Sequence, residues 1–131
     1  MQARGKALFL LLVACALAIG LSSCAKSPVQ VLSAKRSRSY SLGFQTAYPD
    51  KPGTVFLVVT YAGLSADDRK KTLYITDGKN RYPTQLGGVT IKDDKANSFV
   101  VVTVPESQLE FQVVLGDYPP VSFRAAETID D

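Results

Sequence analysis

The chain has 131 residues, with 15 lysines and arginines against 12 aspartates and glutamates, no histidine and two cysteines. Without histidine, neither a Ser-His-Asp triad nor a Cys-His pair is available to activate a nucleophile, and a zinc site rich in histidine or cysteine is excluded. The sequence also has no glycine-rich phosphate loop and no paired-carboxylate signature. We therefore expect a protein that is not an enzyme and that carries no cofactor and no metal.

The first 23 residues have the pattern of a secretory leader. Two positive charges, Arg4 and Lys6, precede an uncharged run over residues 7–23, as in a basic n-region followed by an apolar h-region. The clearly apolar part, residues 7–21, is shorter than the roughly 20 residues that a membrane-spanning helix needs. A cleaved leader is therefore favoured over a transmembrane anchor. Small residues such as Ala18-Ile19-Gly20 would also fit an ordinary signal peptidase.

The stretch Leu21-Ser22-Ser23-Cys24 resembles the lipobox of bacterial lipoproteins, in which an aliphatic and two small residues precede a cysteine. The resemblance implies cleavage between Ser23 and Cys24 and a diacylglyceryl thioether on Cys24, often with a third acyl chain on its amine. Each methylene group buried in the membrane contributes about 0.8 kcal/mol to binding. One acyl chain therefore anchors a protein only marginally, whereas two or more chains anchor it stably. An unmodified Cys24 is the alternative. Ala25-Lys26 lacks the aspartate typical of inner-membrane retention, which implies the outer membrane if the organism has one, and otherwise the outer face of the cytoplasmic membrane.

The mature chain is close to neutral, because Arg4 and Lys6 are the only charges of the leader. Near neutrality and secretion argue against a nucleic-acid partner. With no second cysteine after Cys24 there is no intrachain disulfide, and the length fits one domain. We predict residues 24–38 as a lipidated N-terminus and tether, with an optional strand at 29–32. Its cluster Lys35-Arg36-Ser37-Arg38 either contacts anionic headgroups or belongs to a solvated linker.

From residue 39 onward, apolar and polar side chains alternate with the period of two that is typical of strands. Polar turns such as residues 48–53 and the Asp-Gly turn at 77–80, a favoured hairpin pair, separate these segments. The predicted strands cover residues 39–45, 54–61, 72–76, 81–86, 89–91, 98–104, 109–115 and 121–125. We predict that residues 39–131 form an all-β domain, a single antiparallel two-sheet sandwich, with a small open barrel as the alternative.

The order of elements from Thr54 onward resembles that of the immunoglobulin-like domains of unknown function found on many bacterial lipoproteins. A hydrophobic strand, a polar loop, a strand ending in Asp77-Gly78 and a late strand ending in Val104-Pro105 carry the resemblance. It implies an immunoglobulin-like sandwich and supplies no activity. The sequence departs from that pattern at Ala62-Gly63, where those domains often have an asparagine.

Polar residues within three strands divide the apolar side chains between two faces. The outward face of each strand is the one that carries its polar side chains, which are Thr60 in the first strand, Thr103 in the second, and Glu110 and Gln112 in the third. If these strands share a sheet, the candidate partner face consists of Phe56, Val58, Phe99, Val101 and Val114. Exposed apolar patches of this kind mark partner surfaces. The alternatives are that strand propensity explains these residues, or that the tether or a loop covers them.

Two acidic pairs, Asp67-Asp68 and Asp93-Asp94, supply oxygen ligands of the kind that calcium prefers. Neither pair has the spacing of a calcium loop, and lysines follow each pair closely. We therefore interpret both as solvated turns.

Three tyrosines, Tyr48, Tyr82 and Tyr118, each precede a proline and are candidate ligand loops, with ordinary turn packing as the alternative. The sequence as a whole predicts a lipid-anchored envelope protein. Its sandwich binds or supports another envelope macromolecule, most simply a protein. The second hypothesis is a receptor for a small ligand or glycan that uses the Tyr-Pro loops.

Overall fold

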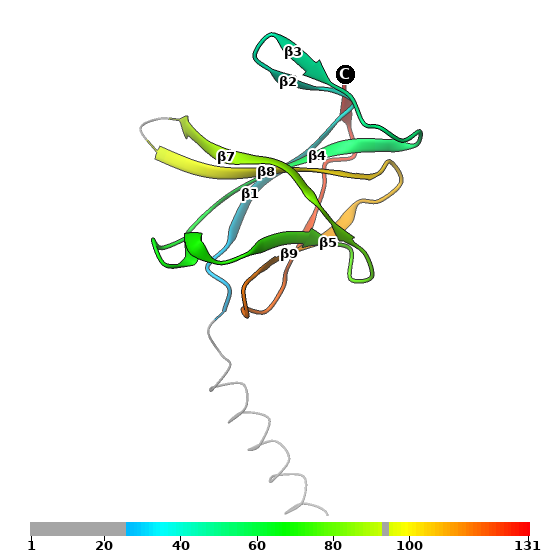
Figure 1. Ribbon diagram of the computed structural model, residues 1–131. Helices are drawn as coiled ribbons and strands as arrows, with labels where there is room; N and C mark the ends of the chain where they lie inside the picture. Colours follow the sequence, from blue (N-terminus) through cyan, green and yellow to red (C-terminus); the bar gives the residue numbers. More distant parts are fainter. Residues whose placement is uncertain (1–25, 93–94) are drawn as a thin grey trace, which may run out of the picture.

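The computed structural model describes residues 26–92 and 95–131, and this part of the chain is almost entirely β-structure (Figure 1). The predicted signal peptide, Cys24 and Asp93-Asp94 lie outside the described residues. Among the described residues the helical element is the 3-10 turn η1 (Asp68–Lys70). No helix in that part of the chain is long and apolar enough to span a bilayer. The expectation of an all-β protein is confirmed.

The strands form two larger sheets and a separate hairpin. The five-stranded sheet has the order β11 (Ile129–Asp130), β1 (Gln30–Ser37), β4 (Thr54–Ala62), β8 (Lys95–Pro105), β7 (Thr84–Lys92). The four-stranded sheet has the order β10 (Val121–Arg124), β9 (Glu110–Leu115), β5 (Leu73–Thr76), β6 (Arg81–Tyr82). The hairpin pairs β2 (Tyr40–Leu42) with β3 (Gln45–Ala47). Neighbouring strands in these sheets are antiparallel, apart from the parallel pair β1–β11.

The two larger sheets share one hydrophobic core. In β4, Val55, Leu57 and Val59 are fully buried in this core, opposite Val100, Val102 and Val104 of β8. The four-stranded sheet contributes Ile75 of β5 together with Phe111 and Val113 of β9. The alternation in the sequence therefore predicted correctly which side chains of β4 and β8 face the core.

The chain crosses from one sheet to the other at Pro83, which separates β6 from β7. A proline has no backbone N–H to donate to a ladder, so strands end beside it. The prediction of one strand over residues 81–86 and another over 89–91 is therefore wrong, because β7 continues through Gly87-Gly88. The strand continues because Gly87 and Gly88 pair with Val100 and Phe99 of β8, and a Cβ at Gly88 would lie 3.0 Å from Cε1 of the Phe99 ring.

Residues 30–37 form β1 and pair with β4 along its length, so the optional strand predicted at 29–32 is present but longer, and the tether predicted up to residue 38 is wrong for residues 33–37. A polar and basic composition concealed this second part of the strand. Arg36 in β1 is 4% exposed. Its guanidinium donates to the carbonyl oxygens of Ala126 (2.7 Å), Glu127 (2.5 Å) and Glu106. Arg36 is therefore not free to contact a lipid headgroup; it connects β1 to the β8–β9 turn and to the segment after β10.

Candidate functional site

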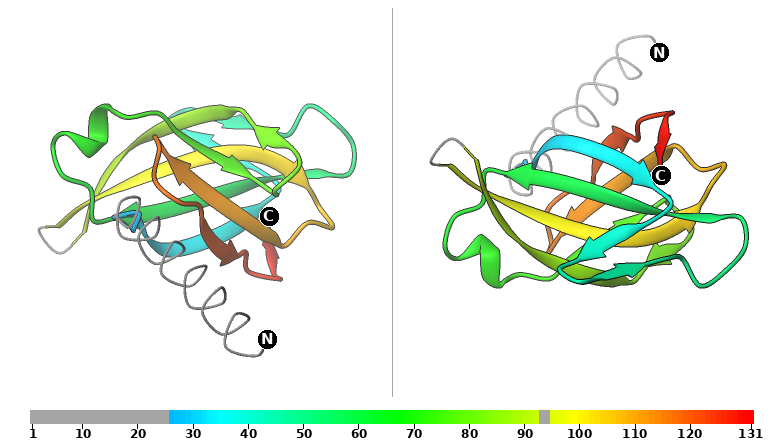
Figure 2. Two further views of the ribbon diagram at one scale, coloured as in Figure 1. Left: turned by 90° about the horizontal axis from the view of Figure 1, so that it is seen from below. Right: turned by 90° about the horizontal axis from the view of Figure 1, so that it is seen from above.

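The outer face of the five-stranded sheet is more covered than expected. Phe56 and Val101 are only 3% and 2% exposed, although both point away from the shared core, and Val58 and Phe99 are partly buried. The β2–β3 hairpin lies on this side of the sheet (Figures 1 and 2). The expectation that these side chains form an open apolar face is wrong for Phe56 and Val101. Alternation identifies the outward side of a strand, but not whether another segment of the chain covers that side.

Val114 does not belong to this face. It lies in β9 of the four-stranded sheet, opposite Tyr74 of β5, and is 8% exposed. The five predicted residues are therefore distributed over two sheets. The period of two assigns a side chain to one side of its strand, whereas the sheet that the strand joins depends on pairing with distant segments.

The two most exposed large apolar side chains, Phe44 and Tyr48, belong to the hairpin turn and to the residue that follows the hairpin, while Val89 (56%) and Leu32 (53%) are exposed elsewhere. Phe44 is 109% exposed, Tyr48 68% and Leu42 45%, and we call these three residues the hairpin patch. Full burial of such side chains is worth about 1.5–3 kcal/mol each. A contact surface that covers the patch would gain this energy.

A tight turn at Gly43 produces this exposure. Gly43 has a φ of +66°, the left-handed region that primed two-residue hairpin turns require. The sequence predicted one continuous strand over residues 39–45, which is wrong because the chain reverses at Gly43-Phe44. The signal that was missed is a glycine between two large apolar residues, Leu42 and Phe44.

The β2–β3 hairpin lies at the opposite end of the domain from the start of the described chain (Figure 1). Strand β1 begins at Gln30, beside Ala62, and ends at Ser37, beside Phe56, and β2 starts three residues later. An eight-residue strand spans roughly 25 Å. The length of β1 therefore separates the start of the described chain from the hairpin.

Tyr82 is part of the core rather than of an open loop. It is 9% exposed, and its ring meets the Phe111 ring edge-on at a centroid distance of 6.0 Å. Its hydroxyl donates to Asp77 Oδ2 at 2.7 Å. Burial, together with this bond to a carboxylate, raises the pKa of Tyr82 to about 12. Ordinary packing therefore accounts for this tyrosine.

Asp77 organises the β5–β6 hairpin, whose existence the sequence predicted correctly. Its Oδ1 accepts from the backbone N–H groups of Asn80 (2.6 Å) and Lys79 (2.8 Å). The Asn80 N–H, the Tyr82 hydroxyl and the Lys79 N–H hold the pKa of Asp77 well below its usual range. All of these bonds stabilise the local turn.

Tyr118 lies in a second polar cluster, between η1 and the β9–β10 turn. Its hydroxyl donates to Asp68 Oδ1 at 3.0 Å, and Lys71 Nζ lies 3.2 Å from the same oxygen. The Lys71 ammonium also lies 4.5 Å from the centre of the Tyr118 ring. Burial raises the pKa of Asp68, but hydrogen bonds from Ser65, Lys71 and Tyr118 outweigh it, so the pKa is lowered overall. The cluster connects two loops and leaves little of this carboxylate free.

The three predicted tyrosines thus lie in three parts of the fold: Tyr48 after β3, Tyr82 on β6 and Tyr118 in the β9–β10 turn. They do not converge on one ligand site. Of the acidic pairs, Asp67 is exposed and Asp68 is buried against Ser65, Lys71 and Tyr118. Across residues 26–92 and 95–131, no three acidic, cysteine or histidine side chains gather as a metal site would require.

No protein-family model, no curated protein and no solved structure matches the chain. Its function must therefore be argued from its own residues. The polar clusters at Asp77 and Asp68 are used by contacts within the fold. The hairpin patch contains the two large apolar side chains that the described fold leaves most exposed, Phe44 and Tyr48.

Proposed function

We propose that the protein is a lipid-anchored, non-catalytic binding domain of the bacterial cell envelope. In this proposal residues 1–23 are removed and Cys24 is acylated. The folded domain, an immunoglobulin-like sandwich, then presents the hairpin patch to another envelope protein. The membrane is the outer membrane where the organism has one, and otherwise the outer face of the cytoplasmic membrane.

The anchor is supported by the basic n-region, the short apolar run and the lipobox resemblance ending at Cys24. Strand β1 begins at Gln30, only six residues after Cys24. Even a fully extended linker of that length reaches roughly 20 Å. An acylated Cys24 would therefore hold the domain close to the membrane by its Lys26 end.

The position of the hairpin patch is the observation that carries the proposal. With the Lys26 end held at the membrane, Leu42, Phe44 and Tyr48 are at the far end of the domain, in an aqueous compartment. Lipid does not reach them there, so an apolar contact at this end is best supplied by a protein. The sandwich assignment is supported by the core that the two larger sheets share.

The absence of catalysis is supported by composition and by the polar clusters. The chain has no histidine. Of the two clustered carboxylates described above, Asp77 serves a turn and Asp68 connects two loops. The proposal therefore assigns binding, and no chemical step, to this domain.

Photo-crosslinking in living cells tests this function. A photoreactive amino acid at position 44 is compared with one at position 117, in the exposed β9–β10 turn, whose Pro119 and Pro120 line a hollow together with Lys26. We expect position 44 to capture a specific protein, identified by mass spectrometry, that position 117 does not capture. Phe44→Ser should reduce capture of the same protein from a crosslinker at position 48. Identical capture from both ends, or capture at position 48 that Phe44→Ser leaves unchanged, would refute the proposal.

A further inference from the structure

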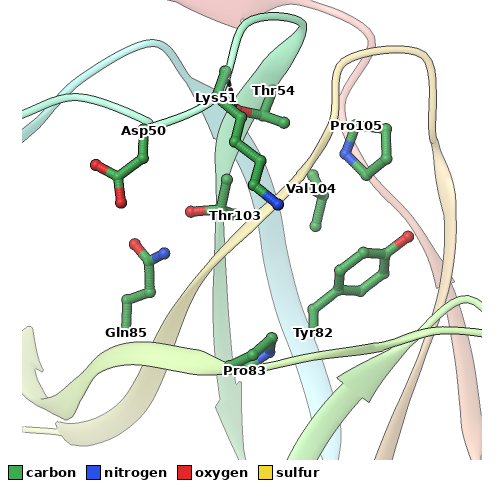
Figure 3. A pocket seen from close by; sticks show the side chains of 9 residues that line it. All are labelled: Asp50, Lys51, Thr54, Tyr82, Pro83, Gln85, Thr103, Val104 and Pro105. Atoms are coloured by element: carbon green, nitrogen blue, oxygen red, sulfur yellow. Dashed lines mark hydrogen bonds between the residues drawn. The ribbon is translucent and has the colours of Figure 1, made fainter.

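An open cavity of about 340 Å³ lies where three segments that are distant in the sequence meet (Figure 3). Its lining residues come from three segments: residues 50–54 before and at the start of β4, residues 82–85 around Pro83, and residues 103–105 at the end of β8. Its volume is at the lower end of the range for small-ligand pockets. The cavity is separate from the three exposed side chains of the hairpin patch, none of which lines it.

Thr103 lines this cavity, and its hydroxyl is a polar group that the fold does not use. Its Oγ1 is buried and has no hydrogen-bond partner among the described residues. A buried hydroxyl left without a partner costs about 1–3 kcal/mol. A valine of nearly the same shape would avoid this cost, so packing alone does not explain a threonine at this position.

Three further polar side chains line the cavity: Asp50, Lys51 and Gln85. All three are exposed, and the described structure shows no ion pair for either charged group. Figure 3 shows the Lys51 ammonium extending into the hollow, while the Asp50 carboxylate and the Gln85 amide point toward each other across it. The cavity therefore presents one cation, one anion and the Gln85 amide, with the Thr103 hydroxyl buried in its wall.

The rest of the lining is apolar apart from Thr54, whose hydroxyl donates to the Lys51 carbonyl oxygen at 2.5 Å, and it contains no open aromatic face. Pro83, Val104 and Pro105 line the cavity together with Tyr82. The Tyr82 ring is 9% exposed and contacts Phe111, and its hydroxyl is bonded to Asp77. A sugar ring that stacks on an aromatic side chain would find no platform here. A simple anion such as phosphate would be attracted by Lys51 but repelled by Asp50.

We propose that this cavity binds a small zwitterion of the peptide class, an amino acid or a short peptide with free termini. The ligand carboxylate pairs with the Lys51 ammonium, and its ammonium pairs with the Asp50 carboxylate. Thr103 and Gln85 bond to the peptide amide, and the proline and valine surfaces receive a small apolar side chain. This site adds a ligand to a domain whose hairpin patch is assigned to a protein partner.

Titration of the purified full-length protein tests the site, with binding followed through backbone amide NMR signals. The probes are alanyl-alanine, its N-acetylated C-terminal amide, which carries neither charge, and maltose as a neutral saccharide. Alanyl-alanine should shift the amide signals of Lys51, Gln85 and Thr103 saturably at millimolar concentration. The uncharged peptide and maltose should bind at least tenfold more weakly.

Matched variants separate the site from general effects of charge. Lys51→Gln and Asp50→Asn should each weaken dipeptide binding at least tenfold. Lys79→Gln, which removes an exposed lysine outside the cavity, should leave it unchanged. Thr103→Val should weaken binding while leaving the protein at least as stable to urea. No saturable shift, equal binding of the uncharged peptide, or preference for maltose would overturn the proposal.

Discussion

Replacing Arg36 with methionine removes the buried cation that connects β1 to two distant segments. The guanidinium is 4% exposed and donates to carbonyl oxygens of Glu106, Ala126 and Glu127. Hydrogen bonds to a charged group contribute about 1.5–3 kcal/mol each. Methionine matches much of the aliphatic length but donates nothing, so the carbonyls lose this donor. Water is expected to replace part of the loss, and we expect the variant to lose at least about 3 kcal/mol, the value of two such bonds at the lower bound.

Such a loss is large beside the 5–15 kcal/mol by which domains are stable. With an m-value of about 1–1.5 kcal/mol/M, the urea midpoint should fall by roughly 2–3 M. The matched control is Arg38→Met, two residues along the chain, where the side chain is 51% exposed and pairs with Glu106 at 2.8 Å. An exposed pair of this kind is worth about 0–1 kcal/mol. If Arg36→Met lowered the midpoint no more than Arg38→Met, the assigned contribution of the buried guanidinium would be wrong.

Three further changes are predicted. Asp77→Asn should be less stable than wild type at neutral pH. The depressed pKa of Asp77 makes its contribution complete above the ordinary value of 3.8, so the two proteins should converge in urea titrations as the pH falls below that value. Gly63→Ala should lower the free energy of unfolding by about 1–3 kcal/mol more than Gly78→Ala does. The two glycines have nearly the same φ angle, +96° and +95°, but of the two only Gly63 would bring a new Cβ against Pro28 O, at 2.3 Å. Equal thermal midpoints of the two variants would contradict this. Leu57 is fully buried, so Leu57→Ala should lower the free energy of unfolding by about 2–5 kcal/mol. A smaller shift of the urea midpoint would show that the core collapses around the space left by the lost methyl groups.

Local patterns in the sequence were sufficient for the strands whose two sides differ in polarity. Thr60 and Thr103 identify the outward sides of β4 and β8, and the core assignments of Leu57 and Val102 follow from them. The Asp77 turn is equally local, since its carboxylate bonds to residues two, three and five positions later. Information within a few residues of each position fixes these features.

Features that depend on distant pairing were not predicted. The basic residues of β1 resemble a tether because nothing nearby shows that Arg36 will meet carbonyls about 70 and 90 residues away. The sheet that contains Val114, and the burial of Phe56 and Val101, likewise depend on which segments return to pair or cover. The cavity at Thr103 combines three separate segments, so no single stretch of sequence contains its signal.

The attachment of the domain to a membrane is the central claim, and mass spectrometry of the N-terminal peptide tests it most directly. The protein is purified from the membrane fraction of cells and digested. We predict a terminal peptide that begins at Cys24, with residues 1–23 absent, and that has the added mass of a diacylglyceryl group. A Cys24→Ala variant should lose this modification and leave the membrane fraction. A terminal peptide that retains the leader, or a free Cys24 thiol in a protein that still fractionates with membranes, would contradict the account.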